Sequence, residues 1–340
     1  MRAGATRRRG ERAASAVDRP GAPRHHTGLH PHDYIGEVPD RLPPELVREL
    51  SRIDAVRALF AILEEWLAIL AAVLLCEHFT WLYPLAILFI GARQHALAVL
   101  GHDAVHHRLL TGRGLNDWVA DLFLWWPIFA TNEAFRRYHG AHHRHIGTDQ
   151  DGNIELWHLR GADGRPTREW TYPKTAWQLA RKLLWRGCGL TGLGLLLVGL
   201  LRPFRVVGPI YGLVRLLALS GVVASFAAAQ HLDLLLYYWL VPFCTWFVAS
   251  NYIRLICEHT MVRSDHPVYA LTRTTVPTWL DRVFIVPRNI SYHYEHHCYP
   301  SVPFYRLPEL HAAMRQLPGY RKHAHVTHGV GSALLECLRR

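Results

Sequence analysis

The chain is poor in cysteine and in charged residues. Its six cysteines, among 340 residues, form no CxxC pair and show no regular spacing, which argues against a disulfide framework and against an iron–sulfur cluster. Isolated thiols with apolar neighbours indicate a reducing compartment. Only 19% of the residues are charged, whereas 50% are hydrophobic. This balance favours one membrane domain with polar segments over two ordinary soluble domains.

Acidic residues are outnumbered by basic ones, at 27 against 38, so that the net charge is +11. The basic residues are divided between the N-terminus and the loops between apolar stretches, and they do not form one aromatic-laced surface. We therefore expect anionic lipid head groups as contacts and no nucleic-acid partner. Residues 1–45 are rich in Arg, Gly and Pro and lack an apolar run. We expect a disordered arm there and no secretory signal.

Four apolar stretches are long enough to cross a bilayer as helices. They are residues 57–76, 80–101, 213–230 and 234–252. Glu64 and Glu65 lie within the first stretch and should face the bundle or an interface, because a carboxylate is costly against lipid. Residues 118–130 are short and contain Pro127, which predicts a re-entrant or interfacial segment, and residues 189–201 predict an interfacial helix.

The distribution of Arg predicts the orientation of these spans. The N-terminal arm, residues 136–205 and the C-terminal tail are rich in Arg, whereas the two short turns between paired spans contain no Lys or Arg. By the positive-inside rule, both termini lie in the cytoplasm. We therefore expect an all-α integral membrane protein of the inner or plasma membrane, with about four transmembrane helices, re-entrant or interfacial helices and a cytosolic, histidine-rich cap.

Three histidine clusters lie within or just beyond the apolar stretches: HDAVHH at residues 102–107, HGAHH at 139–143 and HYEHH at 293–297. Residues at i, i+3 and i+4 share one helix face, and the last two clusters have this spacing. Imidazole suits iron, copper and zinc. The clusters therefore predict a metal site on one side of the membrane, with the following ligands: His102, His106, His139, His142, His143, His293, His296 and His297. Whether His107, His145 and His311 also bind metal stays open at this point.

Two further side chains are candidate ligands. Asn289 precedes the third cluster by one helical turn, so its amide falls on the same stripe and can bind metal directly or through water. His259 follows the fourth span in the sequence RLICEH. Three acids adjoin candidate ligands, and we expect them to orient imidazole rings, with solvation or helix capping as the alternative. These acids are Asp103, Glu258 and Glu295.

The residues around the second cluster admit more than one role. Its flanking arginines, Arg136, Arg137 and Arg144, suit a phosphate or carboxylate head group or an acidic electron donor, or they simply obey the positive-inside rule. Trp125 and Trp126 can line the path of an apolar chain or anchor the protein at the membrane interface.

The clusters resemble the three histidine boxes of the membrane fatty acid desaturase superfamily, in the forms HxxxH, HxxHH and HxxHH. Residues 289–311, NISYHYEHHCYPSVPFYRLPELH, are similar to bacterial members that continue into a YPxVPxxxLPxLH pattern. RLICEH and the third box resemble the branch that contains the rhizobitoxine-type desaturases. The EH element is also similar to one in alkane monooxygenases. The resemblance extends over residues 33–317, and we expect a desaturase domain at residues 46–320 and a C-terminal tail at residues 321–340.

This resemblance implies a non-haem diiron enzyme in which the box histidines hold two iron ions and O2 is the co-substrate. The expected reaction removes hydrogen from an unactivated CH2 group of a fatty acyl or similar alkyl chain and leaves a double bond. A hydroxylase or ketolase of an alkyl or carotenoid-like substrate is the alternative, and a membrane metal-binding or transport protein is a third. The sequence has no HPGG-type haem-binding stretch and no GxGxxG after a strand, so we expect an external ferredoxin or flavoprotein reductase as electron donor.

Overall fold

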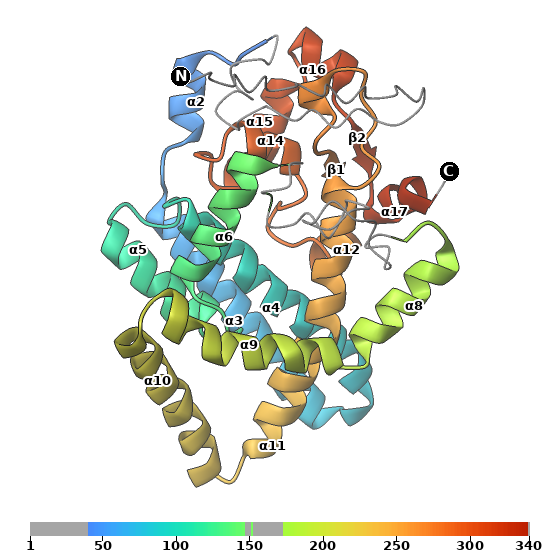
Figure 1. The fold of residues 1–340 in the computed structure, drawn as a ribbon. Helices are drawn as coiled ribbons and strands as arrows, with labels where there is room; N and C mark the ends of the chain where they lie inside the picture. The colour runs from blue at the N-terminus through green and yellow to red at the C-terminus, as the bar shows by residue number, and fades with distance from the viewer. Residues whose placement is uncertain (1–39, 147–150, 152–172, 339–340) are drawn as a thin grey trace, which may run out of the picture.

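The computed structural model describes residues 40–146, 151 and 173–338. The expected N-terminal arm falls almost entirely outside this part of the chain. The described chain is mainly helical, with two short strands. Figure 1 shows α10 and α11 at one end of the molecule and the helices α14, α15 and α16 at the opposite end.

Four helical segments are long and apolar enough to cross a membrane. They are α3 (Ala55–His78), the segment Thr80–Val105 that contains η1 and α4 (Tyr83–Val105), α10 (Pro209–Ala228), and the segment Leu232–His259 that contains α11, η3, η4 and α12 (Val248–His259). All four predicted spans are confirmed. The second and fourth extend beyond their predicted ends, because the helix continues past the apolar residues into the histidines.

Two bent or irregular segments accompany these spans. Helices α8 (Ala176–Gly187) and α9 (Leu190–Val206) meet at an angle of 52°, so that together they form a broken span or a re-entrant loop. Gly189 at the bend has φ 91°, a conformation that glycine adopts without strain. The predicted re-entrant segment at residues 118–130 consists of the end of α5 (Arg113–Ala120) and a π-helical turn, η2 (Asp121–Trp125).

A cap, which we define as α2 and residues 260–338, covers the ends of the spans that carry the histidines. Its helices are α2 (Pro44–Leu50), α13 (Trp279–Phe284), α14 (His293–Cys298), α15 (Leu307–Met314), α16 (Pro318–His323) and α17 (Val330–Leu338). The cap also contains a parallel pair of strands, β1 (Thr274–Val276) and β2 (Val326–His328). The all-α prediction missed this sheet, because three-residue strands carry too few positions for a periodic pattern.

The hydrophobic core has two main parts. One part joins α3, α4 and η2 within the membrane spans and includes Ile90, Leu97 and Trp125. The other part lies in the cap and includes Tyr294 and Leu310. Helix α6 (Asn132–His145) lies between the spans and the cap, and Figure 1 shows it beside α14. The histidines are therefore located where the two parts of the core meet.

Candidate metal centre

Four helices bring nine histidines together. Helix α4 carries His102 and is followed by His106, and α12 ends at His259. Helices α6 and α14 each carry three of the nine. The nine side chains form two groups, and within each group one nitrogen of every ring lies within 4.8 Å of those of the others. The first group is His102, His106, His139, His143 and His296, and the second is His142, His259, His293 and His297.

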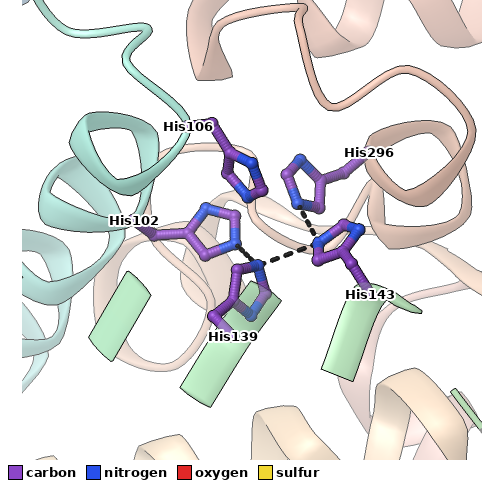
Figure 2. A group of neighbouring side chains, drawn as sticks. All are labelled: His102, His106, His139, His143 and His296. Atoms are coloured by element: carbon purple, nitrogen blue, oxygen red, sulfur yellow. Dashed lines mark hydrogen bonds between the residues drawn. The ribbon is translucent and has the colours of Figure 1, made fainter. Parts of the chain in front are cut away.

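In the first group, the rings converge through their Nε2 atoms (Figure 2). The Nε2 of His139 lies 2.8 Å from that of His102 and 2.9 Å from that of His143. The Nε2 of His143 lies 3.1 Å from that of His296. The Nε2 of His106 is buried and has no hydrogen-bond partner among the described residues. Helices α4, α6 and α14 therefore aim nitrogen atoms at one point.

The second group is built in the same way from α6, α12 and α14. The Nε2 of His293 lies 2.9 Å from that of His259 and 3.0 Å from that of His297. The ring of His142 packs edge-on against that of His259, with centroids 4.9 Å apart. All four histidines are buried. Helix α14 contributes to both groups because His293 and His297 are separated by one turn, while His296 points to the first group.

The two groups adjoin and fit a pair of metal ions. The ring of His143 from the first group stacks on that of His297 from the second, with centroids 4.3 Å apart. Two imidazole nitrogens that bind one ion at about 2.1 Å and at right angles to each other lie about 3.0 Å apart. The Nε2–Nε2 distances of 2.8–3.1 Å match this separation. An all-imidazole set suits iron, copper or zinc.

The electrostatic environment keeps five of the histidine rings neutral, as metal binding requires. Burial, followed by the neighbouring imidazoles, holds the pKa values of His139 and His143 well below the ordinary value. The same causes act on the pKa values of His293 and His297 in α14. Burial and the positive charges of nearby arginines lower the pKa of His106 to about 3. These five rings therefore have a free nitrogen lone pair at neutral pH.

Carboxylates contact some of the rings from the outside. Asp151 accepts a hydrogen bond from His142 Nδ1 at 2.9 Å, and both residues are buried. Glu258 Oε1 lies 3.4 Å from His293 Nδ1 and accepts from Arg254 Nε at 2.6 Å. A hydrogen bond such as that of His142 fixes the tautomer and the orientation of a metal-binding ring, whereas Nδ1 of His293 makes no hydrogen bond among the described residues. Sequence reasoning anticipated Glu258 but missed Asp151, since nothing in the spacing of nine residues indicates this pairing.

The other two predicted acids hold the cap in place, and Oδ1 of Asp103 also lies 4.0 Å from Nδ1 of His102. Glu295 is fully buried and accepts hydrogen bonds from Thr274 at 2.6 Å, from His311 at 2.7 Å and from Tyr320. It therefore ties α14 to β1, α15 and α16. Asp103 accepts from the backbone N–H of Phe304 at 2.7 Å. It thereby connects α4 to the segment that follows α14.

One predicted ligand lies apart from both groups. The Nδ2 of Asn289 donates to the carbonyl of Phe304 at 3.1 Å, and its Oδ1 accepts from Arg282. Both ends of the amide are thus engaged within the protein, and α14 begins only at His293, so that the helical stripe that suggested Asn289 does not exist. The three histidines whose role the sequence left open, His107, His145 and His311, also lie outside the two groups.

The side chains near the second box have structural contacts. Arg136 donates to the carbonyl of Val105 at 3.1 Å and pairs with Asp117 at 2.5 Å. It therefore caps the end of α4, next to the first box. Trp125 and Trp126 are buried, at 2% and 4% exposure, which excludes them as anchors at the membrane interface.

Comparisons with known proteins agree with this geometry. The family model for fatty acid desaturase matches residues 48–329. The chain is 29% identical over 294 residues to dihydrorhizobitoxine desaturase of Bradyrhizobium elkanii, which covers 82% of this chain and 81% of that protein. It is 28% identical over 254 residues to the sphingolipid delta(4)-desaturase/C4-monooxygenase of Homo sapiens, which covers 67% of this chain and 64% of that protein.

The family match covers most of the chain and contains both histidine groups. With its four helices that are long enough to cross a membrane, the protein has the features of a membrane enzyme. The chain belongs to the fatty acid desaturase family and is an oxidoreductase.

Proposed function

We propose that this protein is an integral membrane, O2-dependent desaturase that introduces a double bond into a fatty acyl or similar alkyl chain. The observation that carries the proposal is the pair of adjoining histidine groups, with five and four rings. Their nine rings would hold two iron ions. Bound there, two irons supply the chemistry that removes hydrogen from an unactivated CH2 group with O2 as oxidant.

The chain itself contributes position, charge and the exclusion of water. Eight of the nine rings are buried and only His106 is partly exposed, so the reaction is shielded from bulk solvent. Trp125 and Phe135 pack together beside the first histidine group, with ring centroids 4.6 Å apart, and Phe135 stacks on His139. Because Trp125 is only 2% exposed, these packed rings help to exclude water from the side of His139.

Three parts of the proposal concern the surroundings of the enzyme. The substrate is a membrane lipid or another acyl compound, as the family implies. Electrons come from an external ferredoxin or flavoprotein reductase, because the sequence has no haem-binding or dinucleotide-binding motif of its own. The Arg-rich segments favour the cytoplasm for both termini and for the histidines.

Hydroxylation is the second candidate, because one relative is named as both a desaturase and a C4-monooxygenase. Loss of a second hydrogen gives an alkene, whereas transfer of a hydroxyl group gives an alcohol. A difference of about 1 Å in substrate position is enough to change such an outcome. Transport receives less support, since the nine histidines lie together at helix ends and do not form a path along the spans.

Mass spectrometry of total lipids tests the proposal. Cells would express the wild-type chain, the variant His297→Ala, or the variant His107→Ala, which changes a histidine outside both groups. We expect a new double bond with the wild type and with His107→Ala, and none with His297→Ala. A new hydroxyl group with the same dependence would establish the second candidate. The absence of any modified lipid, in cells supplied with a ferredoxin and its reductase, would refute an acyl-lipid substrate.

A further inference from the structure

A buried group of charges connects the first membrane span to the third histidine box. Glu65 lies in the middle of α3 and is fully buried. Its carboxylate pairs with Arg93 of α4 at 3.2 Å and with Arg288 at 2.6 Å. A carboxylate within a membrane span is costly unless it is paired. One buried acid that holds two arginines therefore calls for a functional explanation.

Arg93 contacts the segment that leads into α14, and Arg288 is part of that segment. The Nη2 of Arg93 donates to the carbonyl of Val283 at 2.6 Å, in the last turn of α13. Arg288 lies between α13 and α14, and its Nη2 also donates to the carbonyl of Ala61 at 3.2 Å. The carboxylate of Glu65 thus joins α3 to α4 and to the connection that precedes the third box.

The backbone of this connection has an unusual conformation. Arg288 and Asn289 have φ values of 53° and 62°, in the left-handed region that side chains other than glycine rarely adopt. Two such residues in succession turn the chain sharply just before His293. The bond from Nε of Arg288 to the buried carboxylate of Glu65 stabilises this turn, and Nη2 adds weaker support through the carbonyl of Ala61 and the exposed carboxylate of Glu64.

A second set of contacts continues from the turn to the first box. The amide of Asn289 donates to the carbonyl of Phe304, whose own N–H donates to Asp103 at 2.7 Å. Asp103 adjoins the ligand His102. The connection before α14 is therefore held on one side by Glu65 and on the other by the helix that carries the first box.

We infer that Glu65 is a positioning residue for the metal centre: through Arg93 and Arg288 it sets α14 relative to α4, so that His296 reaches the first group while His293 and His297 reach the second. This inference rests on the proposed function, because it takes the nine histidines as the ligands of two ions. It assigns a role to Glu65, which faces the bundle, whereas the neighbouring Glu64 has a side chain 71% exposed.

The test is the affinity of the purified protein for ferrous iron, measured by competition with a chelator. The variant Glu65→Gln keeps the shape of the side chain but removes its charge. Loss of a group that orients metal ligands lowers metal affinity by about 10–100-fold, and we expect a loss in this range for the ion at the second group. Glu309→Gln is the control, because its carboxylate also pairs with an arginine, Arg306 at 2.9 Å, but the side chain is 51% exposed and the pair involves neither Arg93 nor Arg288. We expect its affinity to stay within about twofold of the wild type.

Two more variants separate positioning from the penalty of an unpaired charge. Arg288→Lys keeps the charge but loses the forked geometry, and we expect an intermediate loss of iron affinity. Glu65→Gln combined with Arg288→Gln removes both partners of one ion pair. If Glu65 positions α14, this double variant still binds iron weakly and has an altered Mössbauer spectrum. Recovery of wild-type affinity and spectrum in the double variant would overturn the inference, because it would show that Glu65 only neutralises the buried charge of Arg288.

The outcomes distinguish this inference from the proposed function. A wild-type protein that binds fewer than two irons would refute the diiron proposal itself. A wild-type protein with two irons, together with a Glu65→Gln variant of the same affinity and spectrum, would overturn only the role of Glu65. A lower melting temperature alone, without a change in affinity or spectrum, counts against the inference, because it marks a purely structural ion pair.

Discussion

The substitution Gly101→Ala tests how closely the first box is packed. Gly101 precedes His102 in α4, and a Cβ atom at this position would lie 2.5 Å from Cε2 and 2.7 Å from Nε1 of Trp125. Non-bonded carbon atoms prefer separations of about 3.5–4.0 Å, so the indole would have to move by about 1 Å. Trp125 is only 2% exposed and donates to Asn132 at 3.1 Å. It has little freedom to move.

The magnitude follows from three contributions. Overpacking of a buried site costs about 1–3 kcal/mol, and the strained indole hydrogen bond costs about 1 kcal/mol. Alanine stabilises a helix interior relative to glycine by about 1 kcal/mol. We therefore expect the free energy of unfolding to fall by about 1–3 kcal/mol. We also expect weaker iron binding, because Phe135, which packs on Trp125, stacks on His139.

Thermal unfolding in detergent, followed by tryptophan fluorescence, measures the effect. Gly114→Ala is the matched control: Gly114 also lies in a helix, α5, and a Cβ atom there meets nothing within 4 Å. We expect this variant to melt at the wild-type temperature or slightly above it. If Gly101→Ala melted as high as Gly114→Ala, the close approach of Trp125 to α4 would not exist, and the reasoning would fail.

Three further predictions concern the cap and the metal centre. Asp151→Asn weakens the contact with His142 Nδ1 and should lower iron affinity by about 10–100-fold in a chelator competition; unchanged affinity would exclude an orienting role. Burial holds the pKa of His106 at about 3, whereas an unfolded histidine titrates near about 6.5. Below about pH 6.5 the unfolded chain therefore binds more protons than the folded chain. The iron-free protein should lose stability as the pH falls from there. A melting temperature that stays constant between about pH 7 and 5 would contradict this prediction. Thr278→Ala removes one half of the capping box of α13 and should cost about 1 kcal/mol, whereas Thr278→Ser should cost little; equal melting temperatures of the two variants would count against the cap.

Local patterns in the sequence were sufficient to predict the spans. Hydrophobic length alone located α3, α10 and both histidine-bearing spans, because a bilayer requires a run of apolar residues. The ends were less accurate, since α4 and α12 continue as helices past the apolar residues into polar ones. The two strands of the cap were missed, as they are three residues long and pair across about fifty residues of chain.

The candidate ligands were also accessible from local spacing, but their arrangement was not. Spacing of i, i+3 and i+4 places the histidines of each box on one helix face. The same argument failed for Asn289, because the chain before His293 turns through two left-handed residues and is not helical. The charges of the first span were predicted to face the bundle or an interface. Glu65 faces the bundle, while Glu64 is 71% exposed, and the two arginine partners of Glu65 come from distant parts of the chain.

The sequence by itself determined the membrane spans, the three histidine boxes and the resemblance to a family, because each depends on residues close together in the chain. Only the tertiary structure decided how the nine histidines divide into groups of five and four. It also decided that Asp151 contacts His142 and that Glu65 reaches Arg288. The physical reason is that these contacts join helices to one another or to the segments between helices, so the packing of α3, α4, α6, α12 and α14 selects the partners.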